Sequence, residues 1–456
     1  MKNSFKIGLV SLGCPKNLVD SEIILGSLNE KGFEITPFHE LADVIVINTC
    51  AFISDAKEEA IISILDVARY KTQGNLKYLI VAGCLAERYK EEVFKEMPEV
   101  DVVVGTGSID QITGIISRLL SGEAEKERNK VYANKPDSVD YLELSRLMSD
   151  DKPYAYLKIA EGCSNCCTYC IIPSIRGDFR SRTIENITKE ARLLAQNGRK
   201  EIILVAQDVT RYGTDIYGER KLVSLIRELS AIDEIERIRL LYCYPELIDH
   251  ELIKEIKENP KLCKYLDIPL QHISDKMLKA MGRRGNKQYI YELLDKIKEE
   301  IPEIVLRTSF IVGFPGETLD DFQELFDFVK VGYFEHVGVF TYSREEGTPA
   351  YSYKTQLPEK IKNIRREKLM ELQQKNVEKY NNSRIGLIYD TIVEGVADDG
   401  IFYEGRTCSE APEIDPVIYF TSSEPLENGM IVPVKILCSS GYDLVGEVVF
   451  PGSDVD

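Results

Sequence analysis

The repeated alternation of short aliphatic runs with longer amphipathic stretches constrains the fold of this chain most strongly. In the first third, the aliphatic runs cover residues 7–12, 44–48 and 78–82. The stretch from Asp55 to Ala68 is predicted to be helical, with Ile61, Ile62, Leu65 and Val67 on one side. Strands that alternate with helices are typical of βα units around a parallel sheet. The sequence therefore predicts an α/β protein whose amino-terminal part, residues 1–135, is a doubly wound parallel α/β domain.

The middle of the chain repeats this pattern after a polar interval. Residues 122–152 are polar and charged, and we predict a linker at 136–153. Residues 154–355 then hold six candidate strands, at 156–159, 201–206, 238–242, 265–268, 305–311 and 335–342. Six βα units in about 200 residues predict a partial (β/α)6 barrel, because the complete barrel has eight.

The last hundred residues have a different character. Residues 356–384 contain one long charged stretch, from Pro358 to Tyr380, which predicts a helical connector. Short apolar runs follow at 388–396, 417–420 and 431–437, broken by Gly, Asp and Pro. This pattern predicts a small OB-like β-barrel over residues 385–456.

Length and composition limit the class of protein further. The chain has 456 residues, which at roughly 150 residues per domain predicts about three domains. No apolar run approaches the roughly 18 residues of a membrane span, and the start at Met1 to Ile7 does not resemble a signal peptide. We therefore predict a cytoplasmic protein without a membrane partner, whose eleven cysteines are reduced and available as thiolates.

The strongest local motif is Cys-x3-Cys-x2-Cys, formed by Cys163, Cys167 and Cys170 directly after the first predicted barrel strand. Three thiolates on one loop can bind three irons of a 4Fe-4S cubane, and ferredoxin-type clusters need a fourth cysteine for the last iron. An iron without a protein ligand can bind a small molecule. Two alternatives remain: a structural zinc loop, with Cys166 or a distant residue as the fourth ligand, and a simple group of reduced thiols.

A second set of cysteines becomes visible only when the predicted strands are compared. Cys14, Cys50 and Cys84 each follow one strand, at intervals of 36 and 34 residues, which is one βα unit each time. Neighbouring parallel strands would bring these thiols to the carboxyl edge of the sheet, where such folds bind ligands. The alternative is that they are small buried residues at strand ends. We expect structural roles for the other five cysteines and for the four scattered histidines, namely Cys166, Cys243, Cys263, Cys408, Cys438, His39, His250, His272 and His336.

These motifs resemble those of a known family. The Cys163 motif is the signature of radical S-adenosylmethionine (SAM) enzymes, and the flanking Ile171-Ile172-Pro173-Ser174-Ile175-Arg176-Gly177 resembles the methylthiotransferases among them. Those enzymes have an amino-terminal cluster domain, a radical SAM barrel and a TRAM β-barrel, so the resemblance covers nearly the whole chain. The opening Ser11-Leu12-Gly13-Cys14-Pro15-Lys16-Asn17-Leu18-Val19-Asp20-Ser21-Glu22 and the run Ala411-Pro412-Glu413-Ile414-Asp415 are similar to the RimO type, which modifies a ribosomal protein. The MiaB type, which modifies transfer RNA, usually has Gly-Cys-Gln-Met-Asn in the opening run.

The resemblance implies a mechanism. Two 4Fe-4S clusters would be bound, one by Cys163, Cys167 and Cys170 and the other by Cys14, Cys50 and Cys84. SAM would bind the open iron of the first cluster and serve as both radical source and methyl donor, while the second cluster would present sulfur to the substrate carbon. An electron donor such as flavodoxin or ferredoxin would supply the reducing electron. No catalytic residue beyond the clusters is expected, since this chemistry needs no acid–base pair.

Several residues outside the cysteine sets are candidates for contact with SAM. Tyr169 lies beside the last thiolate, and Gln207 and Asp208 follow the second barrel strand on the face where such barrels keep their active sites. The later strand contributes a further set, consisting of Arg307, Ser309, Gly313 and Gly316. The alternatives are an aromatic cover for Tyr169, an internal salt bridge for Arg307 and an ordinary strand-end turn for the two glycines.

The charge distribution indicates the substrate. The net charge is −18, and residues 385–456 contain 14 acidic residues but only two basic ones, Arg406 and Lys435. A barrel that binds RNA should be basic, whereas ribosomal proteins are themselves basic. We therefore expect a basic small-subunit ribosomal protein as partner, not nucleic acid, and the RimO resemblance implies the β-carbon of an aspartate in small-subunit protein twelve. The alternatives are a transfer-RNA adenosine methylthiotransferase, a non-catalytic iron-sulfur electron carrier and an acidic ribosome-binding module with structural zinc.

Overall fold

The structure is a computed structural model that describes residues 5–121 and 123–450. The start of the chain at Met1 to Ser4 and two of the acidic residues counted above, Asp454 and Asp456, lie outside the described residues. Internal contacts divide the chain into two compact units. The first comprises the residues up to Asp150, Lys158–Arg182 and Ser343–Tyr351, and the second comprises Asp151–Leu157, Thr183–Tyr342 and the residues from Ser352 onward. The predicted domain boundaries remain predictions.

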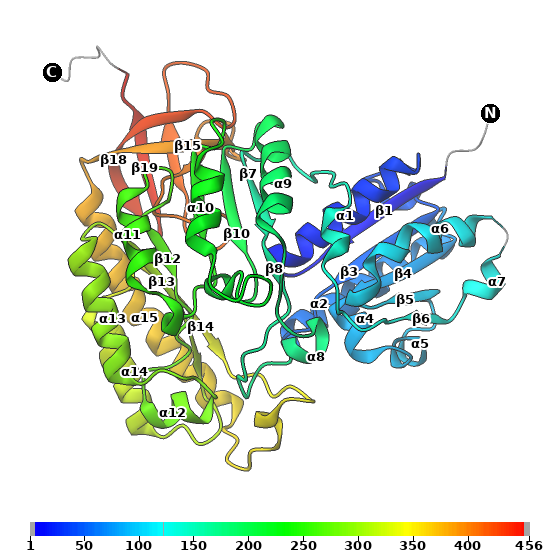
Figure 1. Ribbon diagram of the computed structural model, residues 1–456, viewed down its shortest axis with the longest axis horizontal. Coiled ribbons are helices and arrows are strands. Elements are labelled where there is room, and N and C mark those ends of the chain that lie inside the picture. The colour runs from blue at the N-terminus through cyan, green and yellow to red at the C-terminus, as the bar shows by residue number, and fades with distance from the viewer. Residues whose placement is uncertain (1–4, 122, 451–456) are drawn as a thin grey trace. The chain divides into compact units, whose positions relative to one another are not determined.

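The first unit is built on a six-stranded parallel sheet with the order β2-β1-β3-β4-β5-β6 (Figure 1). Its strands are β1 (Lys6–Ser11), β2 (Glu34–Ile35), β3 (Val44–Thr49), β4 (Tyr78–Gly83), β5 (Val102–Val104) and β6 (Lys130–Tyr132). The order 2-1-3-4-5 is a doubly wound arrangement, and its direction reverses between β1 and β3. The predicted doubly wound domain is confirmed.

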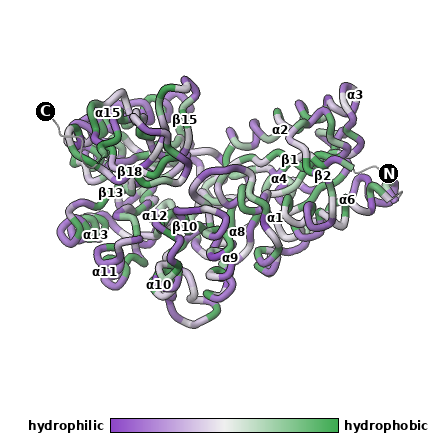
Figure 2. Tube along the Cα trace, turned by 90° about the horizontal axis from the view of Figure 1, so that it is seen from above, coloured by the Kyte–Doolittle hydropathy of each residue, from purple (hydrophilic) through white to green (hydrophobic). Residues whose placement is uncertain are grey.

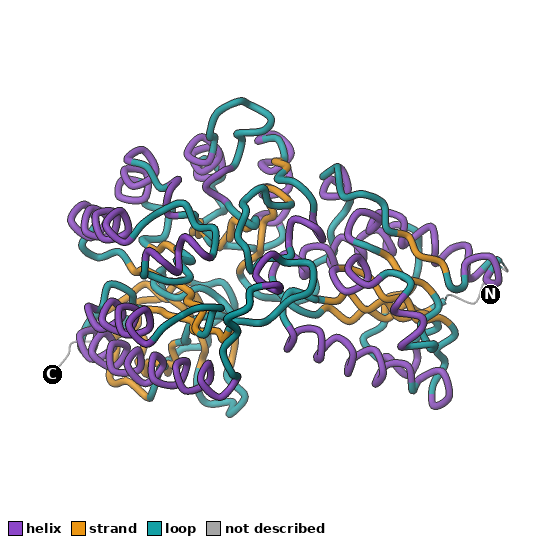
Figure 3. The backbone as a smooth tube through the Cα atoms, turned by 90° about the horizontal axis from the view of Figure 1, so that it is seen from below, coloured by secondary structure: helices purple, strands orange, loops and turns teal. Residues whose placement is uncertain are grey.

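Helices cover both faces of this sheet, as Figure 3 shows. Helices α1 (Pro15–Glu30) and α6 (Ile112–Leu120) pack on the face that carries Val44 and Val46, while α2 (Ser54–Ala68) and α4 (Cys84–Tyr89) pack on the face of Ile45 and Ile47. Every residue of β3 is buried, as expected of a central parallel strand. Shorter elements complete the unit: η1 (His39–Leu41), α3 (Tyr70–Gln73), α5 (Glu92–Glu96), η2 (Thr106–Gln111), α7 (Ala124–Glu127), η3 (Asp140–Glu143), β8 (Ala160–Glu161), α8 (Ile172–Arg176) and β9 (Arg180–Ser181).

One predicted helix face is wrong. Of the four residues expected to share one apolar side of α2, only Val67 is buried, and the side chains of Ile61, Ile62 and Leu65 are 41%, 52% and 43% exposed. The buried face instead consists of Ala60, Ile64, Val67 and Ala68. Alanine at two of these positions lets the helix lie close to the sheet, so side-chain size and not hydrophobicity alone selects the face. The hydropathy along the trace can be followed in Figure 2.

The polar interval at 122–152 contains more structure than the sequence predicted. Residues Lys130–Tyr132 form β6, which pairs in parallel with β5 at the edge of the sheet. Strands β2, β5 and β6 are two or three residues long. Such short strands are defined by hydrogen bonds to a neighbour, and they carry no hydrophobic period that a sequence could display.

The second unit contains the six predicted barrel strands in two groups of three, with the orders β11-β10-β7 and β12-β13-β14. A bridge between Ile238 and Leu262 connects the two groups. The strands are β7 (Tyr154–Lys158, whose last residue belongs to the first unit), β10 (Glu201–Val205), β11 (Arg237–Leu240), β12 (Tyr265–Asp267), β13 (Val305–Val312) and β14 (His336–Thr341). The intervening elements are α9 (Ile184–Gln196), η4 (Val209–Arg211), α10 (Leu222–Ser230), η5 (Pro245–Leu247), α11 (His250–Glu258), α12 (Asp275–Ala280), α13 (Lys287–Glu300) and α14 (Leu319–Val331). The short helix η6 (Pro349–Ser352) follows β14, and all of it except Ser352 belongs to the first unit.

The carboxyl-terminal part of the second unit forms the predicted β-barrel. The long helix α15 (Glu359–Arg384), coloured yellow to orange in Figure 1, precedes it. Five strands then close a barrel in the order β15-β16-β17-β19-β18. They are β15 (Ile388–Val396), β16 (Tyr403–Arg406), β17 (Ile418–Thr421), β18 (Ile431–Ser440) and β19 (Asp443–Val448). The sequence predicted β15, β17 and β18 and missed β16 and β19.

A buried ionic cluster fastens this barrel to the strands of the same unit. Arg406 is fully buried, with Nε 2.7 Å from Glu394 Oε1 and Nη2 3.0 Å from Glu201 Oε2. Arg239 lies 2.6 Å from the other oxygen of Glu201. Burial alone raises the pKa of Glu201, but Arg239 and Arg406 lower it to about 2. One of the two basic residues of the barrel is therefore occupied inside the protein.

Among the described residues, no helix combines the length and the apolar character that crossing a lipid bilayer requires.

Replacing Arg406 tests the stabilising effect of this ionic cluster. Arg406→Met leaves the buried Glu201 and Glu394 carboxylates with one cation fewer, and we expect the free energy of unfolding to fall by about 3–5 kcal/mol in urea denaturation. Because the folded pKa of Glu201 lies below the ordinary glutamate value of 4.5, the stabilisation should be present above that pH and be lost as the pH falls towards 2.

The matched control is the other basic residue of the barrel. Lys435 is only half-buried, and Lys435→Met should change stability by no more than about 0.5 kcal/mol. Equal effects of the two substitutions would contradict the importance of the buried cluster.

Candidate functional site

The second predicted set of cysteines lies along one edge of the first sheet. Strands β1, β3 and β4 are direct neighbours, and Cys14, Cys50 and Cys84 follow their carboxyl ends. This edge includes the point between β1 and β3 where the strand order reverses, which is where open α/β sheets bind ligands. The structure thus brings together three residues that are far apart in the sequence.

Glycine lets the loop that carries Cys14 approach Cys50 closely. Gly13 has a φ of +92°, and a Cβ atom added there would lie only 2.5 Å from Cβ of Cys50 and 3.1 Å from its Sγ. Real Cβ atoms do not approach other heavy atoms so closely, and an L side chain rarely adopts this φ. The approach of the β1 loop to Cys50 therefore requires glycine at position 13.

The electrostatic surroundings of the three thiols differ. Burial raises the pKa of Cys14, but the cations Lys16 and Arg176 outweigh this effect and lower it. Burial, together with the smaller effects of Cys84 and Cys14, raises the pKa of Cys50 to about 12, and burial also raises the pKa of Cys84. Thiols of this kind release their protons when they bind a metal, because the thiolate is the ligand.

The other cysteine set lies on the loop between β8 and α8. The amide nitrogen of Cys163 donates to the carbonyl of Gly177 over 3.0 Å, and that of Cys170 donates to Cys167 over 3.2 Å. Burial, together with the smaller effects of the nearby thiols of Cys167 and Cys163, raises the pKa of Cys170 to about 12. The loop therefore brings the three thiols of the motif close together.

The segment 343–351, which follows the last barrel strand, contacts both cysteine regions within the first unit. The amide of Ala350 donates to the carbonyl of Thr168, inside the Cys163 loop, over 2.9 Å. Glu345 accepts from Lys57 over 2.8 Å and from Arg88 over 2.7 Å, and Arg88 also donates to the carbonyl of Ala51, next to Cys50, over 2.9 Å. The same segment thus steadies the surroundings of both sets.

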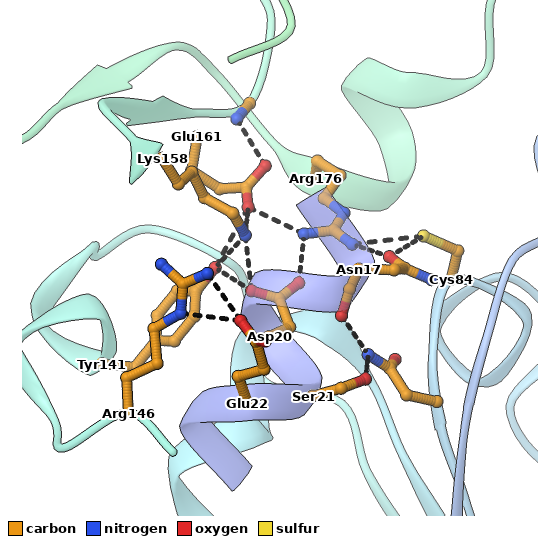
Figure 4. A network of polar contacts seen from close by, with 12 residues as sticks. Asn17, Asp20, Ser21, Glu22, Cys84, Tyr141, Arg146, Lys158, Glu161 and Arg176 are labelled. Carbon is orange, nitrogen blue, oxygen red and sulfur yellow. Dashed lines mark hydrogen bonds and ion pairs between the residues drawn. The ribbon is translucent and has the colours of Figure 1, made fainter. Parts of the chain in front are cut away.

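A buried ionic network joins the two regions, and Figure 4 shows its members pointing towards one another. Arg176, from α8, lies 2.8 Å from Asp20 of α1 and 2.7 Å from Glu161. Lys158 is fully buried and contacts Asp20 and, over 2.9 Å, Glu161. Burial raises the pKa of Glu161, but Arg176 and Lys158 lower it well below its usual range. Two cations and two carboxylates therefore balance one another in charge.

Both cysteine sets have the donor chemistry and setting that an iron-sulfur cluster needs. Each set offers three thiols, and the second lies in the close-packed cradle that Gly13 permits. Among the residues described, no three His, Cys, Asp or Glu side chains are gathered around the position of a single metal ion. The thiolates of a cubane bind different irons and so do not converge on one point. The residues present fit two clusters.

The candidates for SAM contact that follow β10 lie at its carboxyl end. Gln207 is half-buried there, and Asp208 is fully buried, where it accepts a hydrogen bond from Thr210 over 2.5 Å and lies 3.6 Å from Arg211. Tyr169 is half-buried and belongs to the first unit, whereas Gln207 and Asp208 belong to the second. A role of these residues in SAM binding remains a prediction.

The candidates on β13 and the turn after it have internal partners. Arg307 forms salt bridges with Asp267 at 3.1 Å and Asp415 at 3.3 Å, which is the arrangement of the salt-bridge alternative. Ser309 accepts at its carbonyl from Gln271 over 2.8 Å. At Gly313, where φ is +74°, a Cβ atom would lie 2.3 Å from Cγ of Lys362, and Gly316 donates to Thr355 over 2.9 Å. Packing against α15 thus explains why position 313 requires glycine.

The polar residues around the cysteines are not among the site residues predicted from the sequence. Arg176 and Asp20 lie within the family-like segments 171–177 and 11–22, but nothing in their spacing indicates that they meet, 156 residues apart. Lys158 and Glu161 show one local signal, because charged residues in a predicted buried strand need partners. The segment around Glu345 carries no signal at all.

Family models cover most of the chain. The Radical SAM superfamily model matches residues 157–329, the model described as Uncharacterized protein family UPF0004 matches residues 6–105, and the TRAM domain model matches residues 385–449. Among solved structures, the radical SAM methyltransferase TsrM of Kitasatospora setae has a TM-score of 0.55 at 14% identity, with 76% of this chain and 77% of that chain covered. At this identity the likeness concerns the fold alone. The fold and motifs define a radical SAM enzyme with a TRAM barrel.

Curated relatives identify the particular family. The ribosomal protein uS12 methylthiotransferase RimO of Acetivibrio thermocellus is 57% identical over 446 residues, which is 97% of this chain and 98% of that protein. The enzymes of the same name from Trichlorobacter lovleyi and Clostridium tetani are 49% and 50% identical, with the same coverage. The chain belongs to the RimO family of ribosomal protein uS12 methylthiotransferases. This confirms the resemblance and the predicted function, methylthiolation of a small-subunit ribosomal protein by radical SAM chemistry.

Gly13→Ala tests whether the close approach of the β1 loop matters for metal binding. Because the new Cβ would collide with Cys50, we expect a lower iron-to-protein ratio after anaerobic reconstitution than in the parent protein. Gly32→Ala is the matched control, since Gly32 also has a positive φ, of +79°, but has nothing within 4 Å of the added Cβ. Equal iron content in the two variants would contradict the importance of the cradle.

Proposed function

We propose that this chain inserts a methylthio group at the β-carbon of an aspartate in ribosomal protein uS12, using two 4Fe-4S clusters. The observation that carries the proposal is the presence of two sets of three cysteines in one compact unit, each with three ligands for a four-iron cluster. Family membership supports SAM and a radical SAM cluster and points to a second cluster.

The residues of this chain would divide the work as follows. Cys163, Cys167 and Cys170 would bind the cluster that receives SAM, and Cys14, Cys50 and Cys84 would bind the other. When bound, SAM and the first cluster would supply the radical, the second cluster would supply the sulfur, and SAM would supply the methyl group. The chain itself would hold both clusters in one unit and bind SAM, for which we propose Tyr169, Gln207, Asp208, Arg307, Ser309, Gly313 and Gly316.

The charge of the TRAM barrel supports a protein substrate. Of its two basic residues, Arg406 is buried in ion pairs, so only Lys435 remains for contact with phosphate. RNA binding depends on several such cations, and an acidic surface suits a basic ribosomal protein. We therefore propose uS12 and not RNA as the direct partner, with an electron donor such as flavodoxin or ferredoxin. The cytoplasmic location stays a prediction.

Cysteine substitutions test the two cluster sites separately. Reconstituted, reduced protein should release 5′-deoxyadenosine from SAM and add a methylthio group to uS12, detected by peptide mass spectrometry. Cys163→Ala should lose both products, whereas Cys14→Ala should lose methylthiolation and still release 5′-deoxyadenosine. Cys438→Ala, at an exposed cysteine on β18, is the matched control and should retain both.

Three outcomes would count against the proposal. Modification of transfer RNA in place of uS12 would favour the MiaB-type activity. Iron without any SAM cleavage would indicate an electron carrier. Zinc with little iron in metal analysis would indicate a structural metal loop.

Gln207→Ala tests the proposed SAM contact at the end of β10. Loss of one neutral hydrogen bond should weaken SAM binding by about 0.5–1.5 kcal/mol, which corresponds to roughly a twofold to thirteenfold higher KM for SAM, measured in 5′-deoxyadenosine release. Gln196→Ala, at an exposed glutamine on α9, should leave that KM unchanged. The same KM in both variants would exclude Gln207 from the SAM site.

A further inference from the structure

Arg176 is the residue that contacts both cysteine regions at once. Its Nη1 lies between the carboxylates of Asp20 and Glu161, and its Nη2 donates to Oδ1 of Asn17 and lies 3.5 Å from Sγ of Cys84 (Figure 4). Arg176 is 2% exposed, so water does not screen these contacts.

Asn17 extends the contact of Arg176 to the other two strand ends. Its amide nitrogen donates to the carbonyl of Leu12 over 3.0 Å and to that of Thr49, next to Cys50, over 2.9 Å. Asn48, the residue before Thr49, donates in turn to the carbonyl of Asn17 over 2.9 Å. The guanidinium is therefore connected through Asn17 to the ends of β1 and β3, and it contacts Cys84 directly.

The opposite side of Arg176 reaches the Cys163 loop. Glu161 accepts from Arg176 with Oε2 and from the amide of Gly162 with Oε1 over 3.0 Å. Gly162 directly precedes Cys163. A continuous line of polar contacts thus runs from the sulfur of Cys84 through Arg176 and Glu161 to the backbone before the first cysteine of the radical SAM motif.

We propose that Arg176 is a positioning residue for the second cluster, which hydrogen-bonds the Cys84 thiolate, raises the reduction potential of that cluster and fixes it relative to the Cys163 loop. This inference rests on the proposed function, since it requires a cluster on Cys14, Cys50 and Cys84. The direction of the effect follows from charge. Reduction adds an electron to the cluster, and a nearby cation that donates to a ligand sulfur stabilises the reduced form.

The planar guanidinium is suited to this position in a way that lysine is not. Asp20 and Glu161 already face the cation of Lys158, so a lysine at position 176 would keep the charge balance with them. Its single ammonium group cannot present two separate nitrogens, one to the carboxylates and one to the sulfur. Arg176→Lys therefore separates the charge of residue 176 from its hydrogen bond to Cys84.

The test measures the second cluster alone. In the full-length protein with Cys163, Cys167 and Cys170 replaced by alanine, the reconstituted cluster is titrated under electron paramagnetic resonance. Arg176→Gln should shift its midpoint potential to a more negative value, and Arg176→Lys should shift it in the same direction by less. Arg146→Gln is the matched control, because Arg146 is also a buried cation that pairs with a carboxylate of α1, in this case that of Glu22. It should leave the potential unchanged.

Arg176→Gln leaves the buried carboxylates of Asp20 and Glu161 with one cation fewer, which destabilises the fold. A second measurement therefore does not use this variant. Arginine labelled with ¹⁵N in the guanidinium should give a ¹⁵N hyperfine coupling to the reduced cluster in pulsed electron paramagnetic resonance. Arg176→Lys should abolish this coupling, and Arg146→Gln should retain it.

The outcomes separate the two proposals. If the protein binds the cluster but shows no ¹⁵N coupling, the role of Arg176 is wrong while the second cluster stands. The same holds if the midpoint potential does not change when the charge at position 176 is removed. A triple-alanine protein that binds no iron overturns the second cluster, and with it this inference. Coupling that disappears in Arg176→Lys together with the negative shift in potential supports it.

Discussion

Charge balance in the buried network of Asp20, Lys158, Glu161 and Arg176 is the constraint on which the site depends. Taking four charges out of water is unfavourable unless each is paired, and removing one partner of a buried pair is strongly destabilising. Here each carboxylate meets both cations. Because α1, the end of β7, β8 and α8 each contribute one member, a shift of any one of these elements would leave a buried charge without its partner. The network therefore specifies how the Cys163 loop sits on the amino-terminal sheet.

The parallel order of β1, β3 and β4 brings Cys14, Cys50 and Cys84 to one edge of the sheet. A cluster with three protein ligands needs thiols from a small volume, and β1, β3 and β4 supply one each because parallel neighbours end at the same edge of a sheet. The loops after these strands are free of the ladder and can bend towards one another, which Gly13 permits at its contact with Cys50. Asn17 and Asn48 then fix the loops by donating to backbone carbonyls.

The second unit shows how charge is used differently in the TRAM barrel. Acidic residues outnumber basic ones in the barrel. Its buried Arg406 pairs with Glu201 and Glu394 and thereby attaches the barrel to β10. A cation that balances buried carboxylates cannot also release counterions from phosphate, so the count of basic residues overstates what an RNA could contact. Composition and structure therefore argue in the same direction, towards a basic protein partner.

The sequence alone determined the class of fold, the two cysteine sets and the family, because strand periodicity and the spacing of Cys163, Cys167 and Cys170 are local properties of the chain. It also determined that Cys14, Cys50 and Cys84 follow separate strands. The polar residues around these cysteines became known from the folded chain, because Arg176 contacts Asp20 and Cys84 across 156 and 92 residues of sequence. The same holds for the short strands β5 and β6 and for the buried face of α2, which depend on a neighbour's hydrogen bonds and on side-chain size. Long-range pairing of charges leaves no period in a sequence, so it becomes visible only when the chain is folded.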